Sequence, residues 1–354
     1  MTTIINGSSP SITFSDGSAQ TSATRPFLNR IINGAMVISQ AQAGASTTAL
    51  DSYPVDRFKY EASQTSKLTW QQNAGSVTPP AGFTNYLGAT SSSAYSITSS
   101  DFFIITQRIE GFNIADLDWG TANAKTVTLS FWVRSSLTGT FGGVFSNSAG
   151  NRSYPFTYTI SAANTWEQKS VTIAGDTTGT WLTNNGSGIT LRFGLGVGST
   201  FSGTAGAWAG SALFSATGAT SVVGTNGATF YLTGVQLEVG STATSFDYRS
   251  YGTELALCQR YFELITDVTG QNAAFCDVYS NGANLASLTL TYKATKRAAP
   301  TAAVVGSFST SNTSGSLNLQ AGVQNFIAFY SVAGAGRVYW FNNANSGFSF
   351  SAEL

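Results

Sequence analysis

The chain has 354 residues, a length typical of two or three domains. It carries 17 Lys and Arg against 17 Asp and Glu, only 10% of its residues are charged, and it contains no His. Without His the chain cannot build a Ser-His-Asp or Cys-His relay or a His-ligated zinc site by itself. Sparse and balanced charge also argues against nucleic acid as a partner, because binding to phosphates needs clustered Lys and Arg.

Other sequence features exclude further classes. No apolar run approaches the roughly 20 residues of a membrane span, and the N-terminal MTTIINGSSP lacks the pattern of a secretory signal. Cys258 and Cys276 have neither metal-binding nor redox spacing, so we expect two buried thiols in a protein made in the cytoplasm. The low charge predicts a surface rich in Ser, Thr, Asn and Gly, part of it buried against copies of the same chain.

Residues 1–27 are predicted to form an extended N-terminal arm. They are polar, contain one short alternating stretch, SITFSDGS, and end at Arg25-Pro26, where helix is disfavoured. The next segment, NRIINGAMVISQAQ, is interrupted by Asn33-Gly34, which predicts a turn between two short strands.

Residues 28–249 carry a strong strand signal. In Lys125 to Arg134 the apolar residues alternate with polar residues and Trp132, the period of a strand with one buried face. Gly- and Asn-containing turns follow the strands, which indicates an antiparallel β-sandwich of the jelly-roll type. The low-complexity segment 201–229 is predicted to be a long surface loop or an excursion from a sheet edge. Further strands are expected at 153–160, 166–175, 189–198 and 229–240, with turns at 147–151, 175–179, 184–188 and 224–228.

Residues 250–354 are predicted to form a second, smaller β-sandwich. The unit opens with the best helix signal of the chain, Thr253 to Leu264, where Thr253 can cap the N-terminus. Alternating stretches then follow to the end of the chain. They lie at 276–280, 284–294, 299–306, 323–332 and 336–343.

Several passages resemble the virion appendage proteins of tailed bacteriophages. They are NGSSPSITFSDGSAQTSA in the arm, NRIINGAMVISQ followed by YPVDRFKY, and, most specifically, GVQLEVGSTATSFDYRSYGTELALCQRYFE at 234–263. The later KATKRAAPTAAVVG is similar to a strand that follows this pattern in the same proteins. The middle module also looks like the jelly-roll type of carbohydrate-binding module. The resemblance implies an elongated homotrimer whose arm docks onto the virion, although the chain has no heptad coiled coil.

Three carboxylates lie close together in RIEGFNIADLDWG: Glu110, Asp116 and Asp118. If this stretch is extended, Asp116 and Asp118 share one face. The simplest interpretation places all three in a loop before the strand at Lys125. The alternatives are a structural calcium site, because calcium prefers clustered carboxylate oxygens, and a glycosidase pair.

Aromatic residues are the more promising binding chemistry, since sugar rings pack on Trp and Tyr while polar side chains hydrogen-bond their hydroxyls. Trp119, Trp181 and Trp208 lie in Gly-rich loops, where ligand contacts concentrate. We take these three as candidate glycan-binding residues, with loop anchoring or a subunit contact as the alternative. Trp132 and Trp340 are expected in the core, and Trp166 is expected to be structural.

The remaining polar candidates are interpreted as structural. Arg57, Arg108, Arg134 and Arg192 are scattered, so each is expected to form an ion pair or to donate to a loop carbonyl. The stretch 258–262, CQRYF, is expected to join the two β units or to lie near a threefold axis.

Three functional hypotheses follow. The first is a structural protein of a phage virion, a trimeric tail fibre that attaches to host-surface glycans without catalysis or cofactor. The second is a head fibre, capsid decoration or tail-collar protein that contacts only other virion proteins. The third is a glycan depolymerase, which the few acidic residues and the lack of a long repeated β-helix pattern disfavour. All three place the protein in the virion, made in the host cytoplasm.

Overall fold

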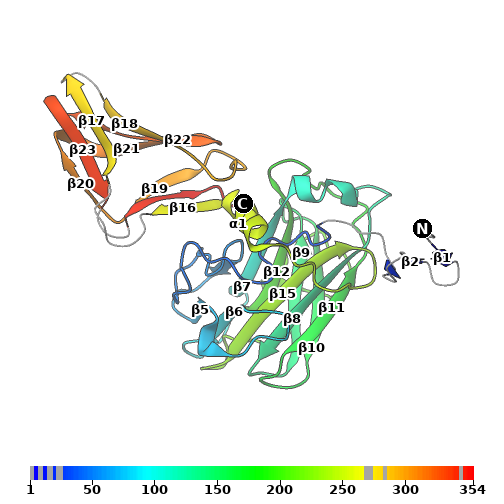
Figure 1. Cartoon of the computed structure of the whole chain (residues 1–354). Coiled ribbons are helices and arrows are strands. Elements are labelled where there is room, and N and C mark those ends of the chain that lie inside the picture. The colour runs from blue at the N-terminus through cyan, green and yellow to red at the C-terminus, as the bar shows by residue number, and fades with distance from the viewer. Residues whose placement is uncertain are drawn as a thin grey trace.

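A computed structural model describes residues 4–6, 11–13, 19–20, 27–266, 274–281, 285–342 and 346–354 (Figure 1). Strands are the main regular structure of the described chain, which confirms the predicted all-β class. Its one α-helix among these residues is α1 (Tyr251–Gln259). No described helix has the length and apolar character needed to cross a membrane.

The first unit is a jelly-roll β-sandwich of two five-stranded sheets, and all paired strands within them are antiparallel (Figure 1). The chain crosses repeatedly between the sheets, so neighbours in a sheet are distant in sequence. The first sheet has the order β10 (Ser153–Ile160), β9 (Gly139–Ser146), β12 (Ser187–Val197), β7 (Phe102–Glu110), β4 (Lys59–Ala62). The second has the order β11 (Glu167–Ile173), β8 (Val127–Ser135), β15 (Thr229–Val239), β6 (Leu87–Ser91), β5 (Leu68–Gln72).

The alternating pattern of β8 determines which face enters the core. Val127, Leu129, Phe131 and Val133 are fully buried, as predicted, and pack between the sheets. Trp132 lies on the opposite face and is half-buried, so its assignment to the core is wrong. The reason is the period of two along a strand, which sends neighbours of inward residues outward.

The low-complexity segment 201–229 is more than a surface loop. It begins after the short helix η4 (Ser199–Phe201), pairs β13 (Ser202–Gly203) with β14 (Ser215–Ala216), and returns across the outer face of the first sheet. It approaches the sheet closely at Gly142 and Gly194, where an added Cβ would lie 2.4 and 2.6 Å from Ser215 Oγ. Glycine at both strand positions is therefore what lets the segment lie on the sheet.

The segment at 29–42 makes the predicted turn but not the two strands. Asn33, in the left-handed region, donates through Nδ2 to the carbonyls of Ile38 and Asp56. Gly34 passes so close to β15 that a Cβ there would lie 2.1 Å from the Val235 carbonyl oxygen. Side-chain hydrogen bonds thus hold this loop in place of a β ladder.

The C-terminal region contains three three-stranded antiparallel sheets around a second core (Figure 1). Phe326, Phe348 and Phe350 are fully buried at its centre. The sheets are β16 (Phe262–Thr266), β24 (Gly347–Ser351), β19 (Thr301–Val305); β17 (Ala274–Asn281), β23 (Ala335–Asn342), β20 (Phe308–Ser311); and β18 (Leu285–Thr291), β22 (Asn325–Val332), β21 (Thr313–Ala321). The side chains of Cys276 and Trp340 lie outside the described set.

Helix α1 ends earlier than predicted, because the chain enters β16 at Phe262 and pairs with β24. The stretch 258–262 then connects the two regions, in agreement with the predicted joining role. Arg260 and Tyr261 both bond to Glu110 of the first sandwich, with distances of 2.6 Å from Arg260 Nη2 to Glu110 Oε1 and from Tyr261 Oη to Glu110 Oε2. Arg57 pairs with Glu353 and stacks over the Tyr261 ring. Cys258 is a buried free thiol, as predicted.

The described backbone of the arm forms a small antiparallel sheet of three short strands. Its strands are β1 (Ile4–Asn6), β2 (Ser11–Thr13) and β3 (Ala19–Gln20). The interpretation of residues 1–27 as an arm that docks onto the virion falls largely outside the described residues.

Candidate functional site

A groove runs over the outer face of the first sheet, across β4, β7 and β12. The antiparallel register aligns Lys59, Thr106 and Arg192 in one row of this face. Because side chains alternate along each strand, Glu61 and Arg108 point to the same side. The groove is a cavity of about 270 Å³ whose lining includes Glu61, Arg108 and Arg192.

Ion pairs organise one side of the groove. Glu61 Oε1 accepts from Arg108 Nη2 at 2.7 Å and from Lys59 Nζ at 3.2 Å, while its Oε2 accepts from Thr106 at 2.6 Å. Lys59 also pairs with Asp51 at 2.7 Å. Burial opposes ionisation of Glu61, but Arg108, Thr106 and Lys59 outweigh it and lower the pKa of its carboxyl to about 2. Glu61 is therefore an ionised hydrogen-bond acceptor at neutral pH.

Aromatic rings form the other side of the groove. Phe214, from the segment 201–229, stacks on Phe201 with the ring centroids 4.6 Å apart and an interplanar angle of 9°. Phe102 of β7 meets Phe214 edge to face at 5.2 Å. Phe102 and Phe214 are half-buried and line the cavity, so they offer apolar surface beside the charged row.

Arg192 lies where these two sides meet. Its Nη1 donates to Ser146 Oγ at 2.6 Å, and its guanidinium lies over the Phe214 ring, 4.7 Å from the centroid. Burial, with a smaller contribution from Arg108 and against the opposing effect of Glu61, lowers the pKa of Arg192 to about 10. The groove therefore combines ionised donors, an ionised acceptor and apolar rings, the combination that recognises a polyhydroxylated ligand.

The three predicted glycan-binding tryptophans do come together, but as a packed cluster. The ring centroids of Trp119 and Trp181 lie 4.7 Å apart, and each lies 5.4 Å from that of Trp208. Trp119 and Trp181 are only 6% and 7% exposed, so as sugar platforms they are corrected to loop anchors. Trp208 is half-buried, and its role as a glycan contact stays a prediction. Each indole N–H donates within the chain. Trp119 donates to the Lys125 carbonyl, Trp181 to the Thr178 carbonyl and the Asp176 carboxylate, and Trp208 to the Ala174 carbonyl.

The three predicted carboxylates do not form a metal site. Asp116 and Asp118 lie in and after the turn η3 (Ala115–Leu117), which follows η2 (Gly111–Asn113), so the stretch is not extended. Glu110 is buried against Arg260 and Tyr261, and Asp118 pairs with Lys125 at 3.4 Å. No group of three or more His, Cys, Asp or Glu side chains suited to a metal exists within the described residues.

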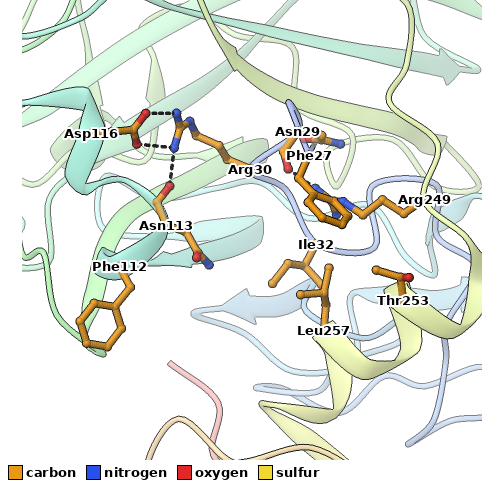
Figure 2. Close-up of a pocket in the computed structure, with 10 residues that line it drawn as sticks. All are labelled: Phe27, Asn29, Arg30, Ile32, Phe112, Asn113, Asp116, Arg249, Thr253 and Leu257. Atoms are coloured by element: carbon orange, nitrogen blue, oxygen red, sulfur yellow. Dashed lines mark hydrogen bonds and ion pairs between the residues drawn. The ribbon is translucent and has the colours of Figure 1, made fainter. Parts of the chain in front are cut away.

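Figure 2 shows that Asp116 is held in an ion pair with Arg30. Both its oxygens accept from Arg30, at 2.8 and 2.7 Å, and this ion pair holds the pKa of Asp116 below its ordinary value. The pair borders a pocket of about 340 Å³ whose lining also includes Phe27 and Phe112. The second arginine that lines this pocket, Arg249, forms an ion pair with Glu254 at 3.2 Å. The charged side chains of this pocket are thus paired within the protein.

Three of the four arginines that were predicted to be structural donate to carbonyl or carboxylate oxygens. Arg57 bonds Glu353 and the Arg108 carbonyl, Arg108 bonds Glu61 and the Leu354 carbonyl, and Arg134 bonds the Asn164 carbonyl at 3.0 Å. Arg192 is different, since it bonds only a hydroxyl. Sequence reasoning missed the groove as a site. The one signal was that Arg192 stands within the predicted strand 189–198.

No protein-family model and no curated protein sequence matches the chain. Solved structures do show similarity. The enzymatically active domain of tailspike protein 4 from bacteriophage CBA120 is 13% identical, with a TM-score of 0.34, over 61% of this chain and 22% of that chain. The module TmCBM61 in complex with β-1,4-galactotriose is 11% identical, with a TM-score of 0.30, over 61% of this chain and 100% of that one. The family 11 carbohydrate-binding module from Clostridium thermocellum is 10% identical, with a TM-score of 0.28, over 57% and 99%. Because the sequence identities and the TM-scores are low, the proposed function rests on the geometry of the groove.

Proposed function

We propose that the protein binds glycans through the groove on β4, β7 and β12. The observation that carries this proposal is that Glu61, Arg108 and Arg192 line one cavity beside the ring of Phe214. A sugar needs both elements, because its hydroxyls form directed hydrogen bonds while its C–H faces pack on aromatic rings. Charged partners strengthen such hydrogen bonds and fix the orientation of the ligand.

We further propose that this binding is not catalytic. A glycosidase needs a carboxylic acid of raised pKa beside a second carboxyl. In the groove the pKa of Glu61 is instead lowered to about 2, which keeps it ionised and unable to donate a proton at neutral pH. Asp51, the other carboxylate of the groove, pairs with Lys59. This chemistry supports a role in attachment.

The biological setting we propose is a phage virion appendage, a trimeric tail fibre that attaches to host-surface glycans. Support comes from the sequence resemblance of residues 6–23, 29–40 and 234–263. Within the third passage, Arg260 and Tyr261 hold the two β regions together through Glu110, so the resemblance covers residues that determine the architecture. Light scattering of the purified protein tests the trimer, and labelling of virions tests the location.

The glycan proposal is tested with a glycan array probed by the purified chain and by Arg108→Ala. We expect selective binding by the wild type and a loss of about tenfold or more in the variant, as for a residue central to a binding site. The control is Arg134→Ala, because Arg134 also bonds a carbonyl and lies over a tyrosine ring, that of Tyr231, on the other sheet. Absence of binding to every glycan would overturn the proposal and favour a purely structural virion protein.

A further inference from the structure

The positive charges of the groove are not equally compensated. Lys59 faces both Asp51 and Glu61, and Arg108 faces Glu61, so these two cations share two carboxylates. Arg192 has no carboxylate within ion-pair distance among the residues that the structure describes. Its one hydrogen-bond partner there is the neutral hydroxyl of Ser146. Lys59 pairs with both carboxylates but does not line the cavity, so the charged side chains at and beside the groove are three cations and two anions, and Arg192 is the cation without an ion pair.

The surroundings of Arg192 disfavour its positive charge in the free protein, because they remove the guanidinium from water. Its Nε atom is buried without a hydrogen-bond partner in the described structure, and one face of the guanidinium is covered by the Phe214 ring. A cation removed from water is stabilised mainly by an opposite charge. Burial and the nearby Arg108 lower the pKa of Arg192, and Glu61, which lies beyond ion-pair distance, opposes them only in part.

The cavity allows such a counterion to arrive with a ligand. Arg192 lines it together with Phe102 and Phe214, so a group bound at the guanidinium has apolar ring surface beside it. A guanidinium binds carboxylates better than it binds hydroxyls, because the charge-assisted hydrogen bonds are stronger. An anion at this point would bring the charged groups at and beside the groove to three positive and three negative charges.

We propose that the groove selects acidic saccharides, with the carboxylate of a uronic or sialic acid bound at Arg192 and the sugar ring against Phe214. This inference rests on the proposed glycan binding and names its ligand class. Arg192 acts as the residue that determines specificity. Glu61 and Arg108, which line the same cavity, hydrogen-bond the hydroxyls of the same ligand.

The test compares two matched probes by calorimetry, an oligogalacturonate and the neutral oligogalactose of the same length. We expect the acidic probe to bind at least about tenfold more tightly, and this preference to fall as salt is raised, since screening weakens ionic contacts. The variant Arg192→Gln should lose the preference, whereas Arg134→Gln on the opposite sheet should keep it.

The outcomes separate the two proposals. If neutral and acidic probes bind equally, or Arg192→Gln keeps the preference, acidic selectivity is overturned while glycan binding stands. If sialylated glycans and neutral glycans, tested in parallel, also fail to bind, both proposals are overturned. Because Arg192→Gln can lower folding stability, the salt dependence of the wild type gives an independent measurement that needs no variant.

Discussion

The groove and the tryptophan cluster are both aromatic regions of the first sandwich, and they differ in what their polar atoms contact. In the cluster, Trp119, Trp181 and Trp208 pack edge to face, and each indole N–H donates within the chain. In the groove, Phe214 lies at a cavity beside Arg192, which lacks a carboxylate partner within the described residues.

This difference shows that aromatic residues in Gly-rich loops do not by themselves make a binding site. Large rings bury much apolar surface, so a protein stabilises itself by packing them together unless another element keeps them apart. At the groove the rings of Phe102, Phe201 and Phe214 also pack together, but Phe214 lies against the guanidinium of Arg192 and lines the cavity. Each of the following predictions changes one member of this comparison.

The largest effect is expected in the cluster. Trp181→Ala should lower the free energy of unfolding by about 3–5 kcal/mol, because it removes a buried ring between two others and leaves a cavity. Chemical denaturation measures this loss. Phe112→Ala is the control, since Phe112 is 61% exposed and its removal should cost at most about 0.5 kcal/mol. A loss below about 1 kcal/mol for Trp181→Ala would contradict the structural role of the cluster.

The second effect concerns acid stability of the groove. The pKa of Glu61 is lowered in the folded state from an ordinary 4.5 to about 2, so its ion pairs stabilise the fold above pH 4.5. This stabilisation, up to about 3 kcal/mol, is lost as the pH falls from 4.5 towards 2. The variant Glu61→Gln should show a weaker pH dependence over this window in denaturation experiments. Parallel curves for the two proteins would show that Glu61 is not held by its cations.

A third and smaller effect is expected at the aromatic side of the groove. Phe214→Ala should weaken saccharide binding by about tenfold, or about 1.4 kcal/mol, because the sugar loses its packing surface. Calorimetry with the same oligosaccharides measures the change. Trp208→Ala serves as the comparison, since it removes the half-buried ring of the cluster. If Trp208→Ala weakens binding more than Phe214→Ala, the site belongs to the cluster and not to the groove.

The smallest effect is expected from calcium. Excess calcium or a chelator should leave Tm unchanged, because Asp116 is paired with Arg30 and Asp118 with Lys125. Thermal unfolding in both conditions checks this expectation. A calcium-dependent rise in Tm that Asp116→Asn abolishes would restore the calcium site predicted from the sequence.

Much of the fold was predictable because its rules are local. Alternation along 125–134 and 229–240 identifies strands, and Gly and Asn turns between them indicate antiparallel pairing. Failures occurred where a distant partner competes with local preference. The helix that contains Thr253 ends at Gln259, because the chain from Phe262 onward pairs with β24 as a strand. The loop at Asn33 forms a side-chain hydrogen bond to the Asp56 carbonyl instead of two strands.

The candidate site could hardly be predicted from the sequence, because it is formed by the pairing of strands that are distant in the chain. Sequence alone determined the all-β class, the exclusion of His-based chemistry and the low charge, because these follow from composition and from the period of two. Only the tertiary structure decided that Lys59, Arg108 and Arg192 share one face, because the register of β4, β7 and β12 brings together residues that are far apart in the sequence. It also decided that Phe214 reaches the sheet, since Gly142 and Gly194 admit the covering segment.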